Sequence, residues 1–340
     1  MASEIKIPHA QLVGIIAKTL AEVGVPAQVA AMEAEVMAEA DLLGVPSHGV
    51  RMLPGLVQGI RDGRVTANPQ IKITRERLAT CVLDGDNGPG RFVSVSAMNQ
   101  AVERARLAGI GACLVTRVSH WGRAHAYAYR AAQAGMIGIC TTNAIPNMLA
   151  WGSAKPLLGN NPLAIAVPHG NEPIILDMAM SNAAVGKIRT YLREGKKVPI
   201  GWGLDAAGKP TEDPAAILNG GKILPFGDHK GVGLALFMEL LTAALSGGLF
   251  SHEIAQADAS GLDAGSSKLF LALNVSAFVD VERFSERVQD FVAWLRQAEP
   301  GLEITLPGER GWQVRERYLA EGIPIHAEIV AQLEAIGVRL

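Results

Sequence analysis

The sequence predicts an α/β fold, because short apolar segments of strand character alternate along its middle part with longer segments of helical periodicity. Composition agrees with that class. Hydrophobic residues make up 49% of the 340 residues and charged residues 19%, so the chain can bury a large core. Its 37 glycines suit a fold with many tight turns and loops that carry a ligand. This length predicts two or three subdomains.

The N-terminal part is predicted to be helical. Apolar residues recur at helical spacing from a start near His9, and a second helix is expected from about Pro26 to Leu43. The segment Gly44-Val45-Pro46 breaks that helix. Ser47 is a favourable N-cap residue, so it is predicted to cap the segment that follows.

The alternation of strands and helices occupies the central part of the chain. The turn-rich segment 85–90 is expected to end the first strand, 201–219 to form surface turns, and 255–267 to be a mobile loop. Predicted strands are 79–83, 112–115, 137–141, 164–168, 174–176 and 269–275, and predicted helices are 92–108, 122–134, 231–246, 284–298 and 324–336.

Charge, apolar runs and cysteines argue against several classes of protein. The net charge is −2, and nucleic-acid binding requires concentrated Lys and Arg. No apolar run reaches the roughly 18–20 residues that span a bilayer, and the N-terminus lacks a signal-peptide pattern, so a cytoplasmic protein without membrane or nucleic-acid partners is expected. Cys81, Cys113 and Cys140 lie far apart in apolar runs, which predicts buried, reduced thiols.

Several common site motifs are missing. The chain has no G-x-G-x-x-G between a strand and a helix and no G-x-x-x-x-G-K-[ST], and Gly109 to Gly111 leads into a predicted strand. A Rossmann or P-loop nucleotide site is therefore not supported. The eight histidines show no metal-ligand spacing, and no G-x-S-x-G occurs, so neither a metal site nor a serine nucleophile is expected.

Ser47-His48-Gly49 is the first candidate site. A histidine just inside a helix start has a defined orientation, and the positive end of the helix dipole is expected to lower its proton affinity. Imidazole titrates near ~6.5, which suits proton transfer to a developing alkoxide, and Gly49 leaves room for a ligand. The alternative interpretation is a purely structural cap histidine.

His120 ends a predicted strand and precedes Trp121-Gly122-Arg123. Ligands in α/β domains gather at the carboxyl ends of strands, and amides at a helix start bind phosphate, which Arg123 can also pair. The alternative interpretation is a loop histidine packed beneath Trp121. His125 lies near the start of the following helix and carries a weaker signal.

Four further segments combine polar groups with turns. Asn160-Asn161-Pro162 offers directional amides but also fits an ordinary turn, and Asp177 ends a strand but also fits a helix cap. Segments 226–231 and 307–311 bracket charged residues with glycines, which fits an anion cradle at a helix start.

An ordered set of short segments gives these candidates a common interpretation. The segments are Gly44-Val45-Pro46-Ser47-His48-Gly49, Ser119-His120-Trp121-Gly122, Trp151-Gly152, Leu158-Gly159-Asn160-Asn161-Pro162, Leu176-Asp177-Met178-Ala179, Gly186-Lys187, Gly201-Trp202-Gly203-Leu204-Asp205, Leu224-Pro225-Phe226-Gly227, His229-Lys230-Gly231 and Pro307-Gly308-Glu309-Arg310. Over almost the whole chain the set resembles the malate/L-lactate dehydrogenase family, whose relatives include ureidoglycolate dehydrogenase, diketogulonate reductase, sulfolactate dehydrogenase and the piperideine/pyrroline-2-carboxylate reductases.

The resemblance implies a fold and its division. The expected fold is α/β, with a family-specific, non-Rossmann dinucleotide-binding domain on a largely antiparallel central sheet and a helical domain built from both chain ends. Residues 1–70 would form the helical N-terminal part of the substrate and dimer domain, and about 71–225 the central NAD(P)-binding domain. The C-terminal helices and strands of 226–340 would complete the cofactor site and the dimer domain. A homodimer is implied, and NAD is not distinguished from NADP.

The resemblance also implies residue roles. His48 would donate and accept the proton at the substrate oxygen with Ser47 orienting it, and His120 would lie beside the nicotinamide and substrate. Residues facing the small anionic substrate would be Arg51, Asn160 and Lys187. Residues binding the cofactor would be Gly122, Arg123, Ala124, His125, Asp177, Met178, Ala179, His229, Lys230, Gly308, Glu309 and Arg310.

Three positions depart from the family pattern. Relatives usually carry a substrate arginine four residues after the first histidine, where this chain has Met52, and Arg51 comes one residue early. One residue turns a helical side chain by about 100°. Either Arg51 reaches the carboxylate by another path or the anion is held elsewhere, as by Lys187. Asn160 stands where relatives commonly have Thr, and Asp228 stands where they frequently have Gly.

The expected activity is hydride transfer between NAD(P)H and a small 2-oxo or 2-hydroxy acid of the malate or lactate type. One alternative is a cyclic imine reductase acting on a piperideine- or pyrroline-2-carboxylate. A second, from another class, is a metal-dependent hydrolase or lyase, and a third is a non-catalytic dimer. The substrate, its stereochemistry and the physiological direction remain open.

Overall fold

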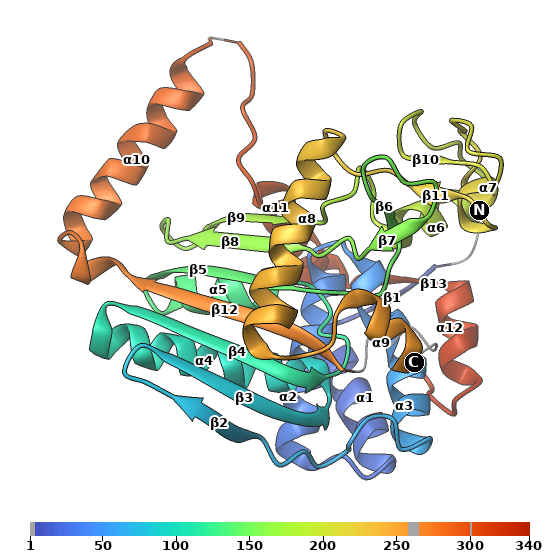
Figure 1. Ribbon diagram of the computed structural model, residues 1–340, viewed down its shortest axis with the longest axis horizontal. Helices are drawn as coiled ribbons and strands as arrows, with labels where there is room; N and C mark the ends of the chain where they lie inside the picture. The colour runs from blue at the N-terminus through green and yellow to red at the C-terminus, as the bar shows by residue number, and fades with distance from the viewer. Residues whose placement is uncertain (1–3, 258–264, 300) are drawn as a thin grey trace.

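The computed structural model describes residues 4–257, 265–299 and 301–340, and a seven-stranded sheet lies at its centre (Figure 1). In spatial order the strands are β2 (Lys72–Glu76), β3 (Thr80–Gly88), β4 (Ile110–Val118), β12 (Ser266–Asn274), β5 (Met136–Thr142), β8 (Leu163–Val167) and β9 (Ile174–Met178). The β3–β4 pair is parallel and the other five pairs are antiparallel. The predicted α/β class is confirmed, and the sheet is largely antiparallel.

Two helices rich in small residues, α4 (Gly90–Ala108) and α5 (His125–Gln133), cover one face of this sheet. Close packing depends on glycine at the strand, because a Cβ on Gly111 would lie 1.9 Å from the carbonyl oxygen of Ala101 in α4. Cys81, Cys113 and Cys140 are buried as free thiols in the central strands, as predicted. Aromatic rings of Trp121, Tyr127 and Phe270 complete the core.

The two chain ends pack together in a second core. Strand β1 (Glu4–Ile7) pairs antiparallel with β13 (Ile323–His326). The apolar side chains of this core come from residues 7–65 and 323–338. The helices of the two chain ends are α1 (His9–Glu22), α2 (Ala27–Leu42), α3 (Leu53–Arg61), α11 (Glu309–Glu321) and α12 (Ala327–Glu334), and the short 3₁₀ turns η1 (Pro46–His48) and η2 (Val50–Met52) link α2 to α3.

A smaller layer lies beside the central sheet. Its four strands, in order, are β10 (Gly203–Leu204), β11 (Lys222–Ile223), β6 (Met148–Leu149) and β7 (Pro156–Leu158), and α6 (Val185–Arg193) and α7 (Pro214–Leu218) accompany them. Helix α8 (His229–Glu239) continues into a π-helical turn, Leu240–Ala244, followed by α9 (Ser251–Ala257). After the 3₁₀ turn Val275–Ala277, α10 (Val281–Gln297) extends away from the body (Figure 1).

Four predictions of local structure are wrong. The segment 201–219, predicted as surface turns, contains β10 and α7, and Ile217 of α7 is buried. Strand β3 continues to Gly88 through the predicted turn, because Asp86 and Asn87 adopt φ of 54° and 51° and a register shift absorbs them. Residues 324–326 belong to β13, since they pair with β1. Of the predicted loop 255–267, residues 255–257 are helical and 266–267 belong to β12, while 258–264 lie outside the described residues.

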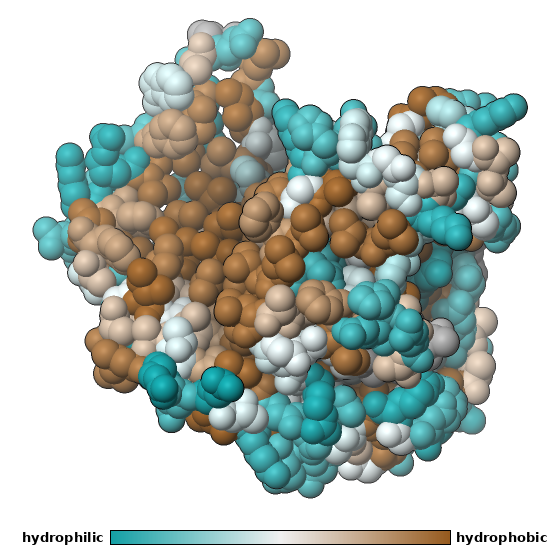
Figure 2. Space-filling view, in the orientation of Figure 1, coloured by the Kyte–Doolittle hydropathy of each residue, from teal (hydrophilic) through white to brown (hydrophobic). Residues whose placement is uncertain are grey.

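Apolar side chains are exposed on one face of the molecule. They gather over α8 and the hollow between α8 and α10 (Figure 2). On α8 and the turns after it they are Leu234, Leu236, Phe237, Leu240, Leu241 and Leu245, hereafter the α8 face. Within the described ranges, no helix has the length and apolar character needed to cross a membrane.

Candidate active site

A cleft of about 1260 Å³ brings together segments far apart in the sequence. It lies where η1, η2 and α6 meet the ends of β4 and β9 and the start of α11. The predicted site residues that line it are Ser47, His48, Arg51, His120, Gly122, Arg123, Ala124, His125, Asn160, Asp177, Ala179, Lys187, Gly308 and Arg310. Most of the candidate residues therefore share one cavity.

His48 ends the short 3₁₀ turn η1, and its ring is oriented by its neighbour. Ser47 Oγ lies 2.9 Å from His48 Nδ1. The predicted role of Ser47 as a helix N-cap is wrong, because its hydroxyl makes no cap hydrogen bond and bonds the imidazole instead. Burial lowers the pKa of His48 to about 4, with Arg123, Arg91 and Arg51 lowering it further and Asp177 opposing them. The direction was predicted, but the main cause is burial and not a helix dipole.

Buried polar side chains hold the backbone around His48. Asp41 Oδ2 accepts a 2.6 Å hydrogen bond from the amide of Val50, and a Cβ on Gly49 would lie 2.1 Å from the Asp41 carboxyl group. Arg91 Nη2 donates to the carbonyl of His48 at 3.2 Å. Asp41 and Arg91 were not identified from the sequence as residues that hold this backbone. A signal was present for Asp41, which is an acidic residue within the apolar helix that ends before Gly44-Val45-Pro46.

Arg91 is anchored in turn by Glu33. Their side chains form an ion pair at 3.4 Å and are 2% and 0% exposed, so the pair is fully enclosed. Glu33 also accepts from the amide of Phe92 at 2.8 Å. A buried pair with such additional hydrogen bonds fixes geometry, since loss of one partner would leave an unpaired buried charge.

His120 faces His48 across the cleft. The ring centroids are 6.0 Å apart with 30° between the planes. His120 Nδ1 accepts from the amide of Gly122 at 3.0 Å, so the proton of the neutral ring lies on Nε2. Burial holds the pKa of His120 well below its usual range, and the charges of His48, Arg91 and Lys268 act in the same direction. Trp121 points instead into the core.

The end of β9 is tied to the start of α5. Asp177 Oδ2 accepts from Arg123 Nε at 3.0 Å and from the amide of His125 at 3.4 Å. His125 packs its ring against Trp312 at 5.5 Å, and burial holds its pKa well below the usual range. Asp177 therefore fixes the loop that follows His120.

The two adjacent asparagines have different environments. Asn160 lines the cleft, and its Oδ1 accepts from Asn147 Nδ2 at 3.2 Å. Asn161 is fully buried; it accepts from the amide of Ala144 and donates to Glu239 Oε2 at 2.8 Å. The segment is therefore more than an ordinary turn, because Asn161 anchors it and Asn160 is presented to the cleft.

Helix α6 and strand β12 complete the wall near His48. A Cβ on Gly186 would lie 2.5 Å from that of Ser47, so glycine is required for α6 to approach this closely. Lys187 lines the cleft, with its Nζ 4.9 Å from the centre of the Trp202 ring. Lys268, which sequence reasoning missed inside an apolar strand, also lines the cleft; it is 1% exposed and donates to Ser266 Oγ at 2.7 Å.

Four residues predicted to bind a cofactor are not part of the cleft lining. His229 and Lys230 are exposed at the start of α8, where His229 lies 5.8 Å from the ring of Trp151. Met178 pairs with Leu163 in the sheet. Glu309 forms an ion pair with Arg296 and accepts from the amide of Leu306 at 2.7 Å. Their contact with a cofactor stays a prediction.

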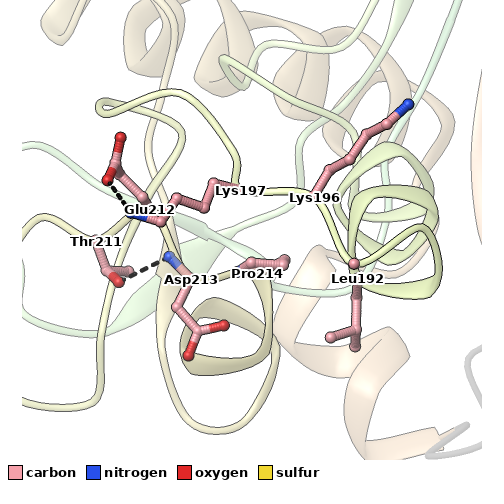
Figure 3. Close-up of a pocket in the computed structure, with 8 residues that line it drawn as sticks. Leu192, Lys196, Lys197, Thr211, Glu212, Asp213 and Pro214 are labelled. Carbon is pink, nitrogen blue, oxygen red and sulfur yellow. Dashed lines mark hydrogen bonds and ion pairs between the residues drawn. The ribbon is translucent and has the colours of Figure 1, made fainter.

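A second, smaller pocket of about 540 Å³ lies between the end of α6 and the segment before α7 (Figure 3). Lys197 pairs with Glu212 at 3.0 Å, and Thr211 Oγ1 accepts from the amide of Asp213 at 3.0 Å. No predicted site residue lines it. In the part of the chain that the structure describes, no three His, Cys, Asp or Glu side chains are placed to hold a metal ion.

Comparison with known proteins identifies the class to which this fold and cleft belong: dehydrogenases and reductases of small hydroxy and oxo acids. The family model described as malate/L-lactate dehydrogenase matches residues 7–334. The chain therefore belongs to the malate/L-lactate dehydrogenase family and is an oxidoreductase of small 2-oxo or 2-hydroxy acids, as predicted.

Relatives and solved structures agree on this assignment. The malate dehydrogenase of Pyrococcus abyssi is 36% identical and covers 99% of this chain and 95% of its own. The L-sulfolactate dehydrogenase of Methanocaldococcus jannaschii is 38% identical over 87% of this chain and 86% of its own. Malate dehydrogenase from Entamoeba histolytica matches with a TM-score of 0.93 at 30% identity over 99% of each chain. Delta1-piperideine-2-carboxylate reductase from Pseudomonas syringae matches with a TM-score of 0.89 at 30% identity, over 98% of this chain and 99% of its own.

Proposed function

We propose that this enzyme uses NADH or NADPH as its hydride donor and that His48 exchanges the proton with the substrate oxygen. The observation that carries the proposal is the facing pair His48 and His120 in a cleft that is also lined by glycine-containing turns. The small acid would occupy the space beside these two rings. Arg51 and Asn160 line the same cleft and would offer hydrogen bonds to its carboxylate.

The residues of these turns fit a dinucleotide. Gly122 and Gly308 have φ of 79° and 97°, and an added Cβ would crowd Arg91 at 3.0 Å and Ile175 at 3.3 Å, respectively. Such turns let the backbone approach a ligand closely. Arg310 lines the cleft from the first turn of α11, where its guanidinium group and the positive end of the helix favour phosphate. When bound, the reduced nicotinamide supplies the hydride that adds to carbon 2 of the substrate.

The chain's own residues handle the proton. With its pKa near 4, His48 is neutral in the free cleft and is ready to accept a proton from a 2-hydroxy acid being oxidised. In the opposite direction, an anionic substrate beside the ring raises the pKa, so His48 takes up a proton from solvent with the substrate and passes it to the oxygen. His120, with its proton on Nε2, donates a hydrogen bond from the opposite side.

A substrate panel tests this proposal. NADH and NADPH oxidation would be followed with pyruvate, oxaloacetate, sulfopyruvate, and the cyclic imines piperideine- and pyrroline-2-carboxylate. Turnover of 2-oxo acids supports the proposal. The likeness to a piperideine-2-carboxylate reductase supplies the second candidate, and preferential imine reduction would establish it. Activity that needs a metal ion and no nicotinamide would contradict both.

We also propose that two copies of the chain associate through the α8 face. Its side chains are well exposed, with Phe237 at 61%, and α10 exposes further apolar side chains such as Trp294 at 62%. Apolar surface extends from α8 into the hollow toward α10 (Figure 2). Monomeric proteins rarely expose large contiguous apolar patches. Burial of these faces against each other would remove that area from water and give a homodimer.

A further inference from the structure

Three arginines lie at or near the cleft that contains His48. Arg51 belongs to η2, and Arg189 and Arg193 follow one another at helical spacing on α6. Arg51 and Arg189 line the cleft. The pKa of Arg51 is lowered by burial and then by the charges of Arg189 and Arg193, with Glu328 opposing them. Arg51 and Arg189 therefore share one cavity, and the charges of Arg189 and Arg193 both act on Arg51.

Glu328 is the one carboxylate of the described residues whose charge acts on Arg51, and it forms no ion pair with these arginines. Across the described ranges, no hydrogen bond or ion pair joins any of the three arginines to another residue, and Arg193 Nε is buried without a partner. Other arginines of the cleft region differ, since Arg123 is paired with Asp177 and Arg91 with Glu33. The positive charge of the three arginines is therefore available to a ligand.

Other charged residues on or next to α6, all of them within the described part of the chain, do not form ion pairs with the three arginines. Glu194, which also lines the cleft, pairs with Lys196 at 2.8 Å. Lys187 holds its ammonium group over the ring of Trp202 at 4.9 Å. A single carboxylate, which Arg51 alone can bind in a bidentate manner, would leave the α6 arginines without a counter-charge.

We infer that Arg189, supported by Arg193, forms a second anion subsite that selects 2-oxo acids carrying two negative charges. Resting on the proposed function, Arg51 binds the carboxylate next to the reacting carbonyl, and Arg189 binds a carboxylate or sulfonate on carbon 3. A monoanion such as pyruvate, or a cyclic imine with one carboxylate, leaves the second subsite empty. Arg189 is thus a specificity-determining residue. Arg193 is a positioning residue whose charge adds to the positive electrostatic potential at Arg189.

Steady-state kinetics with matched substrates test the inference. Oxaloacetate and sulfopyruvate differ from pyruvate by one anionic group, carboxylate or sulfonate. For the unaltered enzyme we expect kcat/KM about 10–100-fold higher for each dianion than for pyruvate, the range of one charge-assisted interaction. Arg189→Gln should remove at least about 10-fold of that ratio through KM for the dianion, with pyruvate kinetics changed little. Arg193→Gln should act in the same direction but less strongly.

Controls separate the possible outcomes. Arg77→Gln, an exposed arginine outside the cleft, should leave every ratio unchanged. Equal use of pyruvate and both dianions, or an Arg189→Gln enzyme that keeps its discrimination, overturns the inference while the proposed function stands. So does a change confined to KM for NADPH relative to NADH, which would assign Arg189 to the nucleotide. If no 2-oxo acid is reduced with either nucleotide, the proposed function itself fails.

Discussion

The imidazole rings of His48 and His120 lie 6.0 Å apart at 30° to one another, although 71 positions separate them in the chain. Each ring is partly buried, and the charged form of His48 lowers the pKa of His120. Protonation of one ring therefore disfavours protonation of the other, and the lowered pKa values leave both rings neutral in the free cleft at neutral pH. A substrate placed between them meets one ring that exchanges a proton and one that donates a hydrogen bond.

Replacement of His48 by alanine should reduce kcat by about 10²–10⁴, the usual effect of losing a general acid or base. Cofactor affinity should be retained, because no predicted cofactor residue depends on this ring. Initial rates and nucleotide fluorescence titration would measure the two effects. His252→Ala is the matched control, since His252 is exposed on α9. Near-normal turnover of His48→Ala would contradict the proposed role.

The pH profile should lack an acid limb near neutrality. Oxidation of a 2-hydroxy acid requires neutral His48, whose pKa of about 4 keeps it neutral above pH 5. We therefore expect kcat/KM to vary little between pH 5 and 8 on account of this group. An ordinary histidine with a pKa of ~6.5 would be mostly protonated at pH 5, and kcat/KM would fall roughly 30-fold. Measurement of kcat/KM against pH in overlapping buffers would distinguish a lowered His48 pKa from an ordinary one.

The stability of Asp41→Asn relative to the unaltered protein should increase progressively as pH rises from 4 to 7. Burial raises the pKa of Asp41 from 3.8 to about 7, so the folded carboxyl keeps its proton in this range while the unfolded chain loses it. The unfolded state then binds fewer protons, and unfolding becomes easier by up to about 1.4 kcal/mol per pH unit from this group. Asparagine cannot ionise. The free energies of unfolding of the two proteins would be measured with denaturant at pH 4, 5.5 and 7. If Asp41 were ionised in the folded protein, the difference between the variant and the unaltered protein would not change with pH.

Gly186→Ala should impair catalysis more than stability. Its Cβ would lie 2.5 Å from that of Ser47, so α6 or the Ser47-His48 turn must shift, and the ring would lose its alignment. We expect kcat to fall by about 10-fold or more, as for other small misplacements in active sites. Gly14→Ala is the control, because its added methyl group meets nothing within 4 Å and α1 should become slightly more stable. Equal kinetics for the two variants would contradict the expected contact.

Phe237→Glu should convert the proposed homodimer into a monomer. A carboxylate in the middle of a buried apolar contact loses its hydration, and the penalty is several kcal/mol. Light scattering coupled to size exclusion would measure the mass as concentration is lowered. Leu78→Glu, at a residue 71% exposed and distant from the α8 face in the chain, should leave the mass unchanged. A monomeric unaltered protein would refute the proposed dimer.

Local patterns predicted the elements that depend on local information. The helix expected over 92–108 is α4 (Gly90–Ala108), and the strand expected over 137–141 is β5 (Met136–Thr142). The errors fall where a distant partner decides the structure. Strand β13 exists because Glu4–Ile7 pairs with it, and β3 continues past Asp84 because β4 holds it across a register shift. No local signal predicts such pairings.

By itself, the sequence determined the fold class, the family and most of the residues that meet in the cleft, because these depend on residue types and their order. Only the tertiary structure decided what those residues experience. It supplied Asp41 and Arg91 beneath the His48 backbone, it placed Arg189 in the same cleft as Arg51, and it lowered the pKa of His48 by burial. Burial and electrostatic fields are sums over neighbours in space, and most of those neighbours are remote in the chain.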